Sequence, residues 1–428
     1  MDRDFQLSLL KKLAEISSGS SDPAGVNQVQ HILKDQLEKW GFRCELVANP
    51  RADIVSGKLL VATLEGFDPR FITFVTHSDT LGSAATHADR FSLDEKRGRV
   101  IGQGILDDKA CQVVALAGIG RYLESLKARG SDSIRPAFSL RFVASPSEEA
   151  GSTGFHSLFR EFGKDSVMAL GFEPSLDDGA IVESRRGNRW YQIHVSGAEA
   201  HSGRAHDKGA NAAHELAIKL VELQKLTNYK RGITVNIGHI QAGRGLYNVV
   251  CGLAEAKVDV RFSDYKSAEW LRSKIEKILA KNHIRAKVGG ARTQTSWEIV
   301  DDCPAFCAEK NSKAFVDAYV KIASRHEKKK VQARISGGAA DVCYMSRPGL
   351  VVMDGLGATG GNMHRADEYA EMASLQTRAA SLAEFLEFSS RKLALSQKLA
   401  SGQKSATKRQ SSKSSGAKGR APSAKRRS

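Results

Sequence analysis

The sequence predicts an α/β fold that is interrupted by an inserted α+β domain, and three observations lead to this expectation. The chain has 428 residues, more than one hydrophobic core usually organises, so two or three domains are expected. Short apolar runs of strand type alternate with helical patterns through most of the chain. Residues 188–262 break this alternation, because strand patterns lie there on both sides of one helical run.

The alternating part of the chain predicts an open α/β sheet that is covered by helices. Its strand and helix patterns lie at residues 71–75, 111–126, 138–144, 167–170 and 350–353. In the inserted part, strand patterns lie at residues 190–195, 234–240 and 254–262, and a helical pattern lies at 211–223. The predicted organisation is therefore a main domain in two parts (1–186 and 301–390), an inserted domain (187–300) and a C-terminal tail (391–428).

The composition is that of a soluble globular protein, with 41% hydrophobic and 26% charged residues. The N-terminal residues lack the continuous apolar stretch of a secretory signal, and no run is long enough to span a bilayer. Six cysteines are scattered through a long chain, which favours reduced thiols over a disulfide framework. These features predict a cytoplasmic location.

The net charge of +16 is concentrated in the tail, because residues 391–428 contain twelve Lys or Arg and no acid. The rest of the chain carries only about +4. The tail is rich in Ser, Ala, Gly and Lys, so we predict a disordered segment beyond roughly Leu399. Contact with nucleic acid or another polyanion is expected only through this basic tail.

The first candidate site residues stand where the strand pattern 71–75 ends, in Thr76-His77-Ser78-Asp79. Residues two apart on an extended chain face the same side, so His77 and Asp79 can point together. A metal-bound imidazole needs an acceptor that fixes its orientation, and Asp79 can serve directly or by positioning a neighbouring group. A His and an Asp at this spacing also occur at strand ends by chance.

Further carboxylates and a histidine follow other predicted elements. Asp107 opens the helical pattern that starts near residue 110, and Glu148 and Glu149 follow the strand pattern 138–144. Glu173 and His364 follow the patterns 167–170 and 350–353. Alone, the segment of Asp107 can be a simple helix cap, and paired acids such as Glu148 and Glu149 usually indicate a solvated helix start. Because open α/β sheets place their sites at one sheet edge, we expect all of them to converge there.

Histidine and carboxylate ligands suit zinc and, less specifically, manganese or cobalt. A bridging carboxylate can hold two ions a few ångströms apart, and Asp107 is the natural bridge. Glu148, beside the ligand Glu149, is the acid that remains to move the proton from the hydrolytic water to a leaving amine.

The ordered motifs THSDT, GQGILDDK, SPSEEAGS, GFEPS and GNMHRADEY resemble the di-zinc M20 metallopeptidase family, most closely its glutamate carboxypeptidase branch, over roughly residues 5–390. The resemblance implies an α/β catalytic domain with a central mixed sheet and an inserted α+β lid and dimerisation domain. It implies two Zn²⁺ ions per subunit, for which Co²⁺ or Mn²⁺ can substitute. The implied ligands are His77, Asp107 and Glu173 for one ion and Asp107, Glu149 and His364 for the other, with Glu148 as the base and Asp79 as a supporting acid.

The resemblance extends into the inserted domain and implies a homodimer formed through it. His201, in a Gly-x-x-x-His-Ser-Gly motif, is expected to reach across the dimer and polarise the scissile carbonyl in the partner's site. Asn248 and Arg261 match substrate-contacting positions. A solvated loop histidine and a sheet-edge arginine remain alternatives for His201 and Arg261.

Two departures from the glutamate-selective pattern concern positions that bind a second substrate carboxylate. The Pro-Ala-Phe that follows the inserted domain is preceded by Asp301-Asp302-Cys303 instead of an Arg, and position 181 is Ile instead of Lys. Glutamate selectivity is therefore not predicted. Arg185, Arg186 and Arg334 are candidate replacements for these cations.

The leading functional prediction is a metal-dependent hydrolase that cleaves dipeptides or short peptides with a free C-terminal carboxylate. The alternative enzyme is an amidohydrolase that removes an acyl group from an N-acyl amino acid. A third hypothesis, from another class, is a polyanion-binding protein with an inactive hydrolase body. All five metal ligands and the base are present, which argues against an inactive body.

Overall fold

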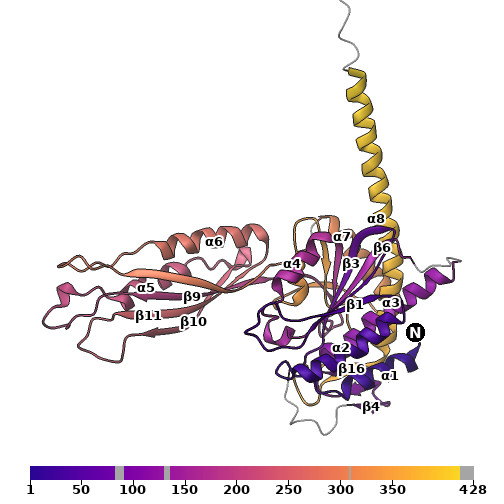
Figure 1. Ribbon diagram of the computed structural model, residues 1–428, viewed down its shortest axis with the longest axis horizontal. Coiled ribbons are helices and arrows are strands. Elements are labelled where there is room, and N and C mark those ends of the chain that lie inside the picture. The colour runs from indigo at the N-terminus through magenta and orange to yellow at the C-terminus, as the bar shows by residue number, and fades with distance from the viewer. Residues whose placement is uncertain (82–90, 130–134, 308–309, 415–428) are drawn as a thin grey trace, which may run out of the picture.

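The computed structural model describes residues 1–81, 91–129, 135–307 and 310–414 of the chain. They form two parts, which Figure 1 shows side by side. The main domain is built from the N-terminal and C-terminal parts of the chain. The inserted domain projects from the main domain as a long arm.

The main domain contains a six-stranded mixed sheet in the order β1-β2-β6-β3-β7-β14. Strands β6, β3, β7 and β14 are parallel to one another, whereas β2 and β1 pair antiparallel at one edge. The strands are β1 (Arg43–Val47), β2 (Leu59–Leu64), β3 (Asp68–His77), β6 (Phe138–Ser145), β7 (Ser166–Gly171) and β14 (Val351–Met353). The carboxyl ends of the four parallel strands therefore meet at one edge of the sheet.

Each face of this sheet has its own hydrophobic core. Successive side chains of a strand point to opposite faces, so Leu140 and Phe142 of β6 enter one core and Val143 enters the other. The first core includes residues of α1 (Arg3–Ala14), α2 (Pro23–Glu38), α3 (Cys111–Lys127), α7 (Lys310–His326) and α8 (Met372–Ser414). The second core includes α4 (His156–Asp165) and the helical turn Asp341–Met345. The sheet is thus a covered middle layer, which explains why all residues of β6 are buried.

Two smaller sheets complete the main domain. One has the order β15-β16-β5-β4 and is antiparallel, and the other pairs β13 with β8 in parallel. Their strands are β4 (Ser92–Asp94), β5 (Arg99–Ile101), β8 (Ile181–Arg185), β13 (Ala333–Ser336), β15 (Gly360–Gly361) and β16 (Tyr369–Glu371). The sheet with β15 and β16 lies next to the segment that carries His364.

The inserted domain is a four-stranded antiparallel sheet, in the order β10-β11-β9-β12, with two helices. Its elements are β9 (Gly187–Ser196), α5 (Ala212–Gln224), β10 (Thr234–Ala242), β11 (Leu253–Phe262), α6 (Tyr265–Ala280) and β12 (Gln294–Cys303). A separate hydrophobic core joins the helices to the sheet. Side-chain caps begin both helices, because Asn211 accepts from the backbone of His214 and Asp264 accepts from that of Ser267.

The predicted alternation of strands and helices in the main domain is confirmed, and so are the strand and helix patterns inside the insertion. The expected domain boundaries stay predictions. Strand β9 begins at Gly187, and β12 runs to Cys303, three residues past the expected boundary at 300/301.

The C-terminal helix differs from the expectation of a disordered segment beyond roughly Leu399 in the basic tail 391–428. Helix α8 continues to Ser414 and extends away from the main domain (Figure 1). Residues 391–414 consist mainly of Ala, Leu, Lys, Gln, Arg and Ser with a single glycine and no proline, so a helix that is already anchored on the core can continue through them. The remaining predicted disorder, at residues 415–428, lies outside the described residues.

The anchored part of α8 packs closely on α3. A Cβ atom at Gly118 of α3 would lie 2.5 Å from Cδ2 of Leu382 of α8, so only glycine permits this approach. Helices of the length and hydrophobicity that a bilayer crossing requires are absent from the described part of the chain.

Glu215 of α5 joins the two helices of the inserted domain. Its buried carboxylate accepts from the backbone N–H groups of His283 (2.7 Å) and Ile284 (2.8 Å) and lies 3.1 Å from Nζ of Lys219. Lys219 also donates to the carbonyl of Leu279, near the end of α6 (2.9 Å). Burial raises the pKa of Glu215, but the backbone hydrogen bonds outweigh it and lower the pKa to about 2.

Glu215→Gln is expected to lower the free energy of unfolding of the inserted domain by about 3 kcal/mol near neutral pH, because it leaves the Lys219 ammonium buried without its counter-charge. The folded pKa of Glu215 is depressed below its ordinary value of 4.5. Its contribution is therefore present above that value and is lost as the pH falls towards 2. Urea unfolding followed by tryptophan fluorescence measures this, since three of the four tryptophans lie in the inserted domain.

Glu222→Gln, on the same helix, is the matched control and should change the free energy of unfolding by less than about 0.5 kcal/mol. Equal stabilities of the Glu215→Gln variant and the unchanged protein at neutral pH would contradict the structural role of this carboxylate.

Candidate metal centre

The parallel strands deliver the predicted ligands to one edge of the central sheet. His77 is the last residue of β3, and β3 lies between β6 and β7. Glu148 and Glu149 form a helical turn three residues after the end of β6, and Glu173 follows β7 by two residues. Because these strands are parallel neighbours, residues just beyond their carboxyl ends come together.

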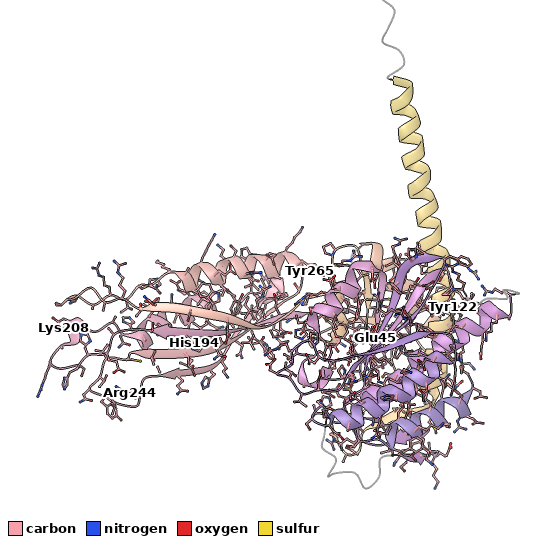
Figure 2. The ribbon with its side chains drawn as sticks, viewed as in Figure 1. Glu45, Tyr122, His194, Lys208, Arg244 and Tyr265 are labelled. Atoms are coloured by element: carbon pink, nitrogen blue, oxygen red, sulfur yellow. The ribbon has the colours of Figure 1, made fainter. Side chains whose placement is uncertain are left out.

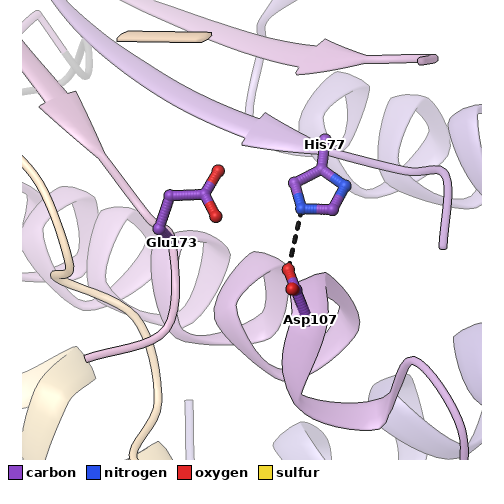
Figure 3. A group of neighbouring side chains, drawn as sticks. All are labelled: His77, Asp107 and Glu173. Carbon is purple, nitrogen blue, oxygen red and sulfur yellow. Dashed lines mark hydrogen bonds and ion pairs between the residues drawn. The ribbon is translucent and has the colours of Figure 1, made fainter. Parts of the chain in front are cut away.

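The first group of candidate ligands is His77, Asp107 and Glu173, whose ligand atoms lie within 4.8 Å of one another. Figure 3 shows His77 at the end of β3, Asp107 on a helical turn before α3 and Glu173 beyond β7, with their side chains directed towards one another. Nε2 of His77 lies 2.9 Å from Oδ1 of Asp107. His77 is buried, so this group is closed off from bulk solvent on the side of the sheet.

The second group is Asp107, Glu149 and His364, with ligand atoms again within 4.8 Å of one another. Nε2 of His364 lies 3.2 Å from Oδ2 of Asp107 and 3.4 Å from Oε1 of Glu149. Asp107 therefore belongs to both groups and presents one carboxylate oxygen to each histidine. The structure brings together all five residues that the sequence predicts as metal ligands.

The donor atoms of both groups suit a divalent cation. Oε1 of Glu149 is buried and has no hydrogen-bond partner, although a buried carboxylate oxygen normally has one. Nδ1 of His77 lies 2.9 Å from the carbonyl oxygen of Asp79, which can only accept, so Nδ1 carries a proton. Nε2 donates to Asp107 in this structure and is the nitrogen that could bind an ion after losing its proton. An imidazole oriented in this way, together with carboxylates, is a typical zinc ligand set.

Burial and nearby charges change the proton affinity of the carboxyl groups at this edge. Burial raises the pKa of Glu173 to about 8, with the charge of His77 opposing this shift and that of Asp107 adding to it. Burial also raises the pKa of Glu148 well above its ordinary value, and the charge of Glu173 adds to this shift. Burial opposes ionisation of Asp107 as well, yet hydrogen bonds from His364 and His77 hold its pKa below the usual range. Asp107 is thus the carboxylate most strongly held in its ionised form by the two histidines.

Asp79 connects the first histidine with the loop after β6. Its carboxylate accepts from the hydroxyl of Ser20 (2.6 Å) and from the backbone N–H groups of Glu148 (2.9 Å) and Glu149 (3.1 Å). Oδ1 of Asp79 also lies 3.4 Å from Nδ1 of His77. Asp79 therefore fixes both the imidazole and the two glutamates, as a supporting acid is expected to do.

Glu368 is a site residue that sequence reasoning did not identify. Its buried carboxylate accepts from the backbone N–H groups of Gly104 (2.9 Å), Leu106 (2.7 Å) and Asp107 (2.9 Å). It thereby holds the loop that presents Asp107. The signal was its position four residues after His364 within the motif GNMHRADEY, so one segment provides both a candidate ligand and the support of Asp107, which belongs to both candidate groups.

The structure does not bring His201 and Asn248 to this centre. Arg261 pairs in register with Asn188 near the start of β9, whereas His201 lies beyond the far end of that strand. Ten residues of extended chain span roughly 30 Å, so His201 is remote from the centre of its own chain. Figure 2 shows Lys208, in the loop that follows His201, at the far end of the arm. His201 and Asn248 are close to each other, because the backbone N–H of Ser202 donates to the carbonyl of Asn248 (2.9 Å).

Two of the three arginines that could replace the missing cations, Arg185 and Arg334, are engaged elsewhere. Arg185 is buried and pairs with Asp354 at 2.5 Å, and it also donates to the carbonyl of Gly338 (3.0 Å). Arg334 pairs with Asp178 at 2.6 Å. Asp354 in turn accepts from the backbone N–H of Glu173 (3.3 Å), so Arg185 supports the ligand segment from behind. The suggestion that Arg185 or Arg334 binds a substrate carboxylate is therefore not supported by this geometry.

A pocket of about 600 Å³ lies beside the metal ligands, between the main domain and the base of the inserted domain. Glu148, Glu149 and His156 line it from the main domain, and Asn188, Trp190, Arg261 and Asp301 line it from the strands of the inserted domain. Arg261 thus reaches the site of its own chain, unlike His201 and Asn248. The pocket is the place where a substrate can contact Glu148.

Comparisons with known proteins agree with this architecture. Residues 184–287 match the family described as the peptidase dimerisation domain. The chain is 27% identical over 380 residues to carboxypeptidase G2 of a Pseudomonas species, covering 86% of this chain and 85% of that protein. It is 26% identical over 368 residues to a succinyl-diaminopimelate desuccinylase of a Bradyrhizobium species, covering 81% and 90%.

Solved structures with the same fold include the aminopeptidase PepT of Bacillus cereus, with a TM-score of 0.68 at 19% identity, covering 90% of this chain and 99% of that one. An M20 family metallo-carboxypeptidase of Sulfolobus solfataricus has a TM-score of 0.59 at 16% identity, covering 90% and 99%. These similarities show an α/β domain with an inserted dimerisation domain, as the sequence predicts.

Glu368→Gln is expected to weaken metal binding by about ten- to a hundredfold, because it removes charge and one acceptor from the group that holds the Asp107 loop. Competition with a zinc chelator of known affinity measures this. Glu371→Gln, three residues further along the chain, alters a partly buried ion pair with Arg99; it is the control and should leave the affinity unchanged. Equal zinc affinities of the Glu368→Gln and Glu371→Gln variants would show that the loop is held without this carboxylate.

Proposed function

We propose that this chain is a metallopeptidase of the M20 family, as its similarity to proteins of that kind suggests. Its proposed reaction is hydrolysis of the amide bond of dipeptides or short peptides with a free C-terminal carboxylate. The observation that carries the proposal is Asp107, which lies between two groups of His and carboxylate ligands beside a substrate-sized pocket.

The ligand geometry supports two Zn²⁺ ions per subunit, for which Co²⁺ or Mn²⁺ can substitute. His77, Asp107 and Glu173 would hold one ion, and Asp107, Glu149 and His364 would hold the other. Ions in such a pair lower the pKa of water and polarise a carbonyl oxygen. The orphaned oxygen of Glu149 and the oriented imidazole of His77 support this assignment.

Glu148 is the proposed general base. It lines the pocket beside Glu149 but belongs to neither ligand group, so its carboxylate remains available for proton transfer. The high proton affinity that burial gives this carboxyl group suits a residue that takes a proton from water and passes it to the leaving amine near neutral pH. Asp79 would keep Glu148 in place through the hydrogen bond to its backbone.

Substrate positioning is proposed to involve both subunits of a homodimer. Arg261 lines the pocket and its Nε pairs with Asp259 at 2.9 Å, so its terminal guanidinium N–H groups can bind the C-terminal carboxylate of the substrate. The remote position of His201 and Asn248 on the arm is consistent with service to the other subunit's site, where the partner subunit's His201 would polarise the scissile carbonyl. The match of residues 184–287 to a dimerisation domain supports the same arrangement.

An N-acyl amino acid amidohydrolase is the second candidate. The observation that favours it is the similarity to a succinyl-diaminopimelate desuccinylase over most of both chains. The same base and ligands would serve, since both reactions cleave an amide. A screen of dipeptides, tripeptides and N-acyl amino acids with zinc, cobalt or manganese separates the two by relative kcat/KM.

Glu148→Gln is expected to lower turnover by roughly a hundredfold to ten-thousandfold while the metal content stays at about two ions per chain, because proton transfer is lost and the ligands are intact. Elemental analysis after reconstitution and the initial rate on the best dipeptide are the two measurements. Near-normal turnover would exclude Glu148 as the base. An active form with a single tightly bound ion would contradict the bridging role of Asp107.

His201→Ala is expected to reduce turnover strongly with little loss of stability, since a carbonyl-polarising donor acts mainly in the transition state. Mixing this variant with Glu148→Gln tests the cross-subunit role. A heterodimer of two inactive chains keeps one site with both residues and should regain part of the activity. Absence of recovery after verified subunit exchange would refute service across the dimer.

A further inference from the structure

Asp301 of β12 lies in the wall of the pocket beside the proposed base. Strand β12 has an irregularity between Ile299 and Asp301, after which Asp301 pairs in register with Trp190 of β9. A bulge of this kind redirects the side chains that follow it and is common next to active sites. Asp301, Trp190 and Val300 all line the pocket that also contains Glu148.

The Asp301 carboxylate is held in a fixed position by neutral donors. The Tyr344 hydroxyl donates to Oδ1 at 3.0 Å, and the side-chain amide of Asn188 donates to Oδ2. The Tyr344 ring stacks on His156 with 4.0 Å between centroids, so the hydroxyl has little freedom to turn away. Both carboxylate oxygens therefore act as acceptors of hydrogen bonds from uncharged groups.

The charge of Asp301 has no counter-charge in the described part of the protein, because none of the ion pairs there includes it. The neighbouring Asp302 differs, since it pairs with the buried Arg189 at 2.9 Å. Arg261, the one Lys or Arg among the described lining residues of the pocket, pairs with Asp259 at 2.9 Å. Asp301 thus gives this side of the pocket an uncompensated negative charge.

Trp190 adds a second feature that suits a cation. Its side chain is 45% exposed and stands next to Asp301 in the sheet. An indole face and a carboxylate side by side bind ammonium and guanidinium groups well, because both attract positive charge. A carboxylate of the substrate would be repelled at the same position.

We propose that Asp301 recognises a cationic group of the substrate and so determines the specificity of the site. The inference rests on the proposed amide hydrolysis and deepens it: preferred substrates carry an alkylammonium or guanidinium group close to the scissile amide, and substrates with a glutamate side chain there are disfavoured. The cation can come from the side chain of the C-terminal residue or from the free α-amino group of the N-terminal residue.

The test compares kcat/KM for four substrates of the zinc-loaded enzyme: acetyl-Ala-Leu as the neutral reference, acetyl-Ala-Lys, Ala-Leu and acetyl-Ala-Glu. At least one of the two cationic substrates should exceed the reference by roughly tenfold or more, as expected for a charge-assisted hydrogen bond, and the glutamate substrate should fall below it. The preferred cationic substrate identifies the source of the cation. Rates within about twofold for all four would overturn the proposal.

Asp301→Asn should lower the ratio of the preferred substrate to the reference to about one, whereas Asp301→Glu, which keeps the charge, should retain part of the preference. Glu298→Gln is the matched control, because it removes an exposed carboxylate from the same strand outside the pocket and should keep the full ratio. A ratio that survives Asp301→Asn would also overturn the proposal.

Binding measured by calorimetry separates this proposal from the proposed function. Zinc-loaded Glu148→Gln protein should bind the preferred cationic substrate roughly tenfold more tightly than acetyl-Ala-Leu, and the double variant with Asp301→Asn should bind both equally. If the unchanged enzyme cleaves none of the four substrates and this binding difference persists, the hydrolase assignment fails and the cation site stands. Equal binding without Asp301→Asn would refute the cation site whatever the turnover.

Discussion

The shared position of the Asp107 carboxylate is the constraint on which the rest of the site depends. One oxygen faces His77 at the end of β3, and the other faces His364 from the C-terminal part of the chain. Asp108, Glu149 and Glu173 bring further carboxyl groups to the same edge, and burial raises the pKa of each of these three. Buried carboxylates this close cannot all be ionised without positive charge among them. The arrangement is therefore that of a site completed by cations.

The two-domain architecture places chemistry and substrate selection on different parts of the chain. The candidate ligands and the proposed base follow the parallel strands of a covered sheet, where neighbouring strands restrict their positions. The other wall of the pocket consists of strands from the inserted domain, which contribute Arg261, Trp190 and Asp301. A substitution on those strands can therefore change which substrate is preferred without moving a candidate metal ligand. In the proposed function, the base of the inserted domain thus lines the pocket and determines substrate specificity. Its far end carries His201, which cannot reach the site of its own chain.

Much of the fold and nearly all of the ligand set could be predicted from the sequence. Residues directly after apolar strands must lie at a sheet edge, and His77, Glu149 and Glu173 all stand in such positions. Glu368 could not be assigned in this way, because its function is to accept three backbone hydrogen bonds from a loop distant in sequence. The ion pair between Arg185 and Asp354 could not be predicted from the sequence either, because only the fold brings these two residues together. The length of α8 does not follow from hydrophobicity, which is low beyond Leu399 and predicts disorder, because helix propensity and anchoring on α3 favour continuation of the helix.

The departure from the glutamate-selective pattern acquires a physical meaning from the fold. A cation before the Pro-Ala-Phe segment would favour a substrate carboxylate, whereas this chain has Asp301 and Asp302 there. The two acids are adjacent but not equivalent: Asp302 neutralises the buried Arg189, so it belongs to the folding of the strand. Asp301 is on the opposite face of β12, in the pocket, with donors that are neutral. Because neighbouring residues of a strand face opposite sides, Asp302 stabilises the fold and Asp301 faces the substrate. The substrate group that fits this wall of the pocket is therefore positively charged, whereas the side chain of glutamate is negatively charged.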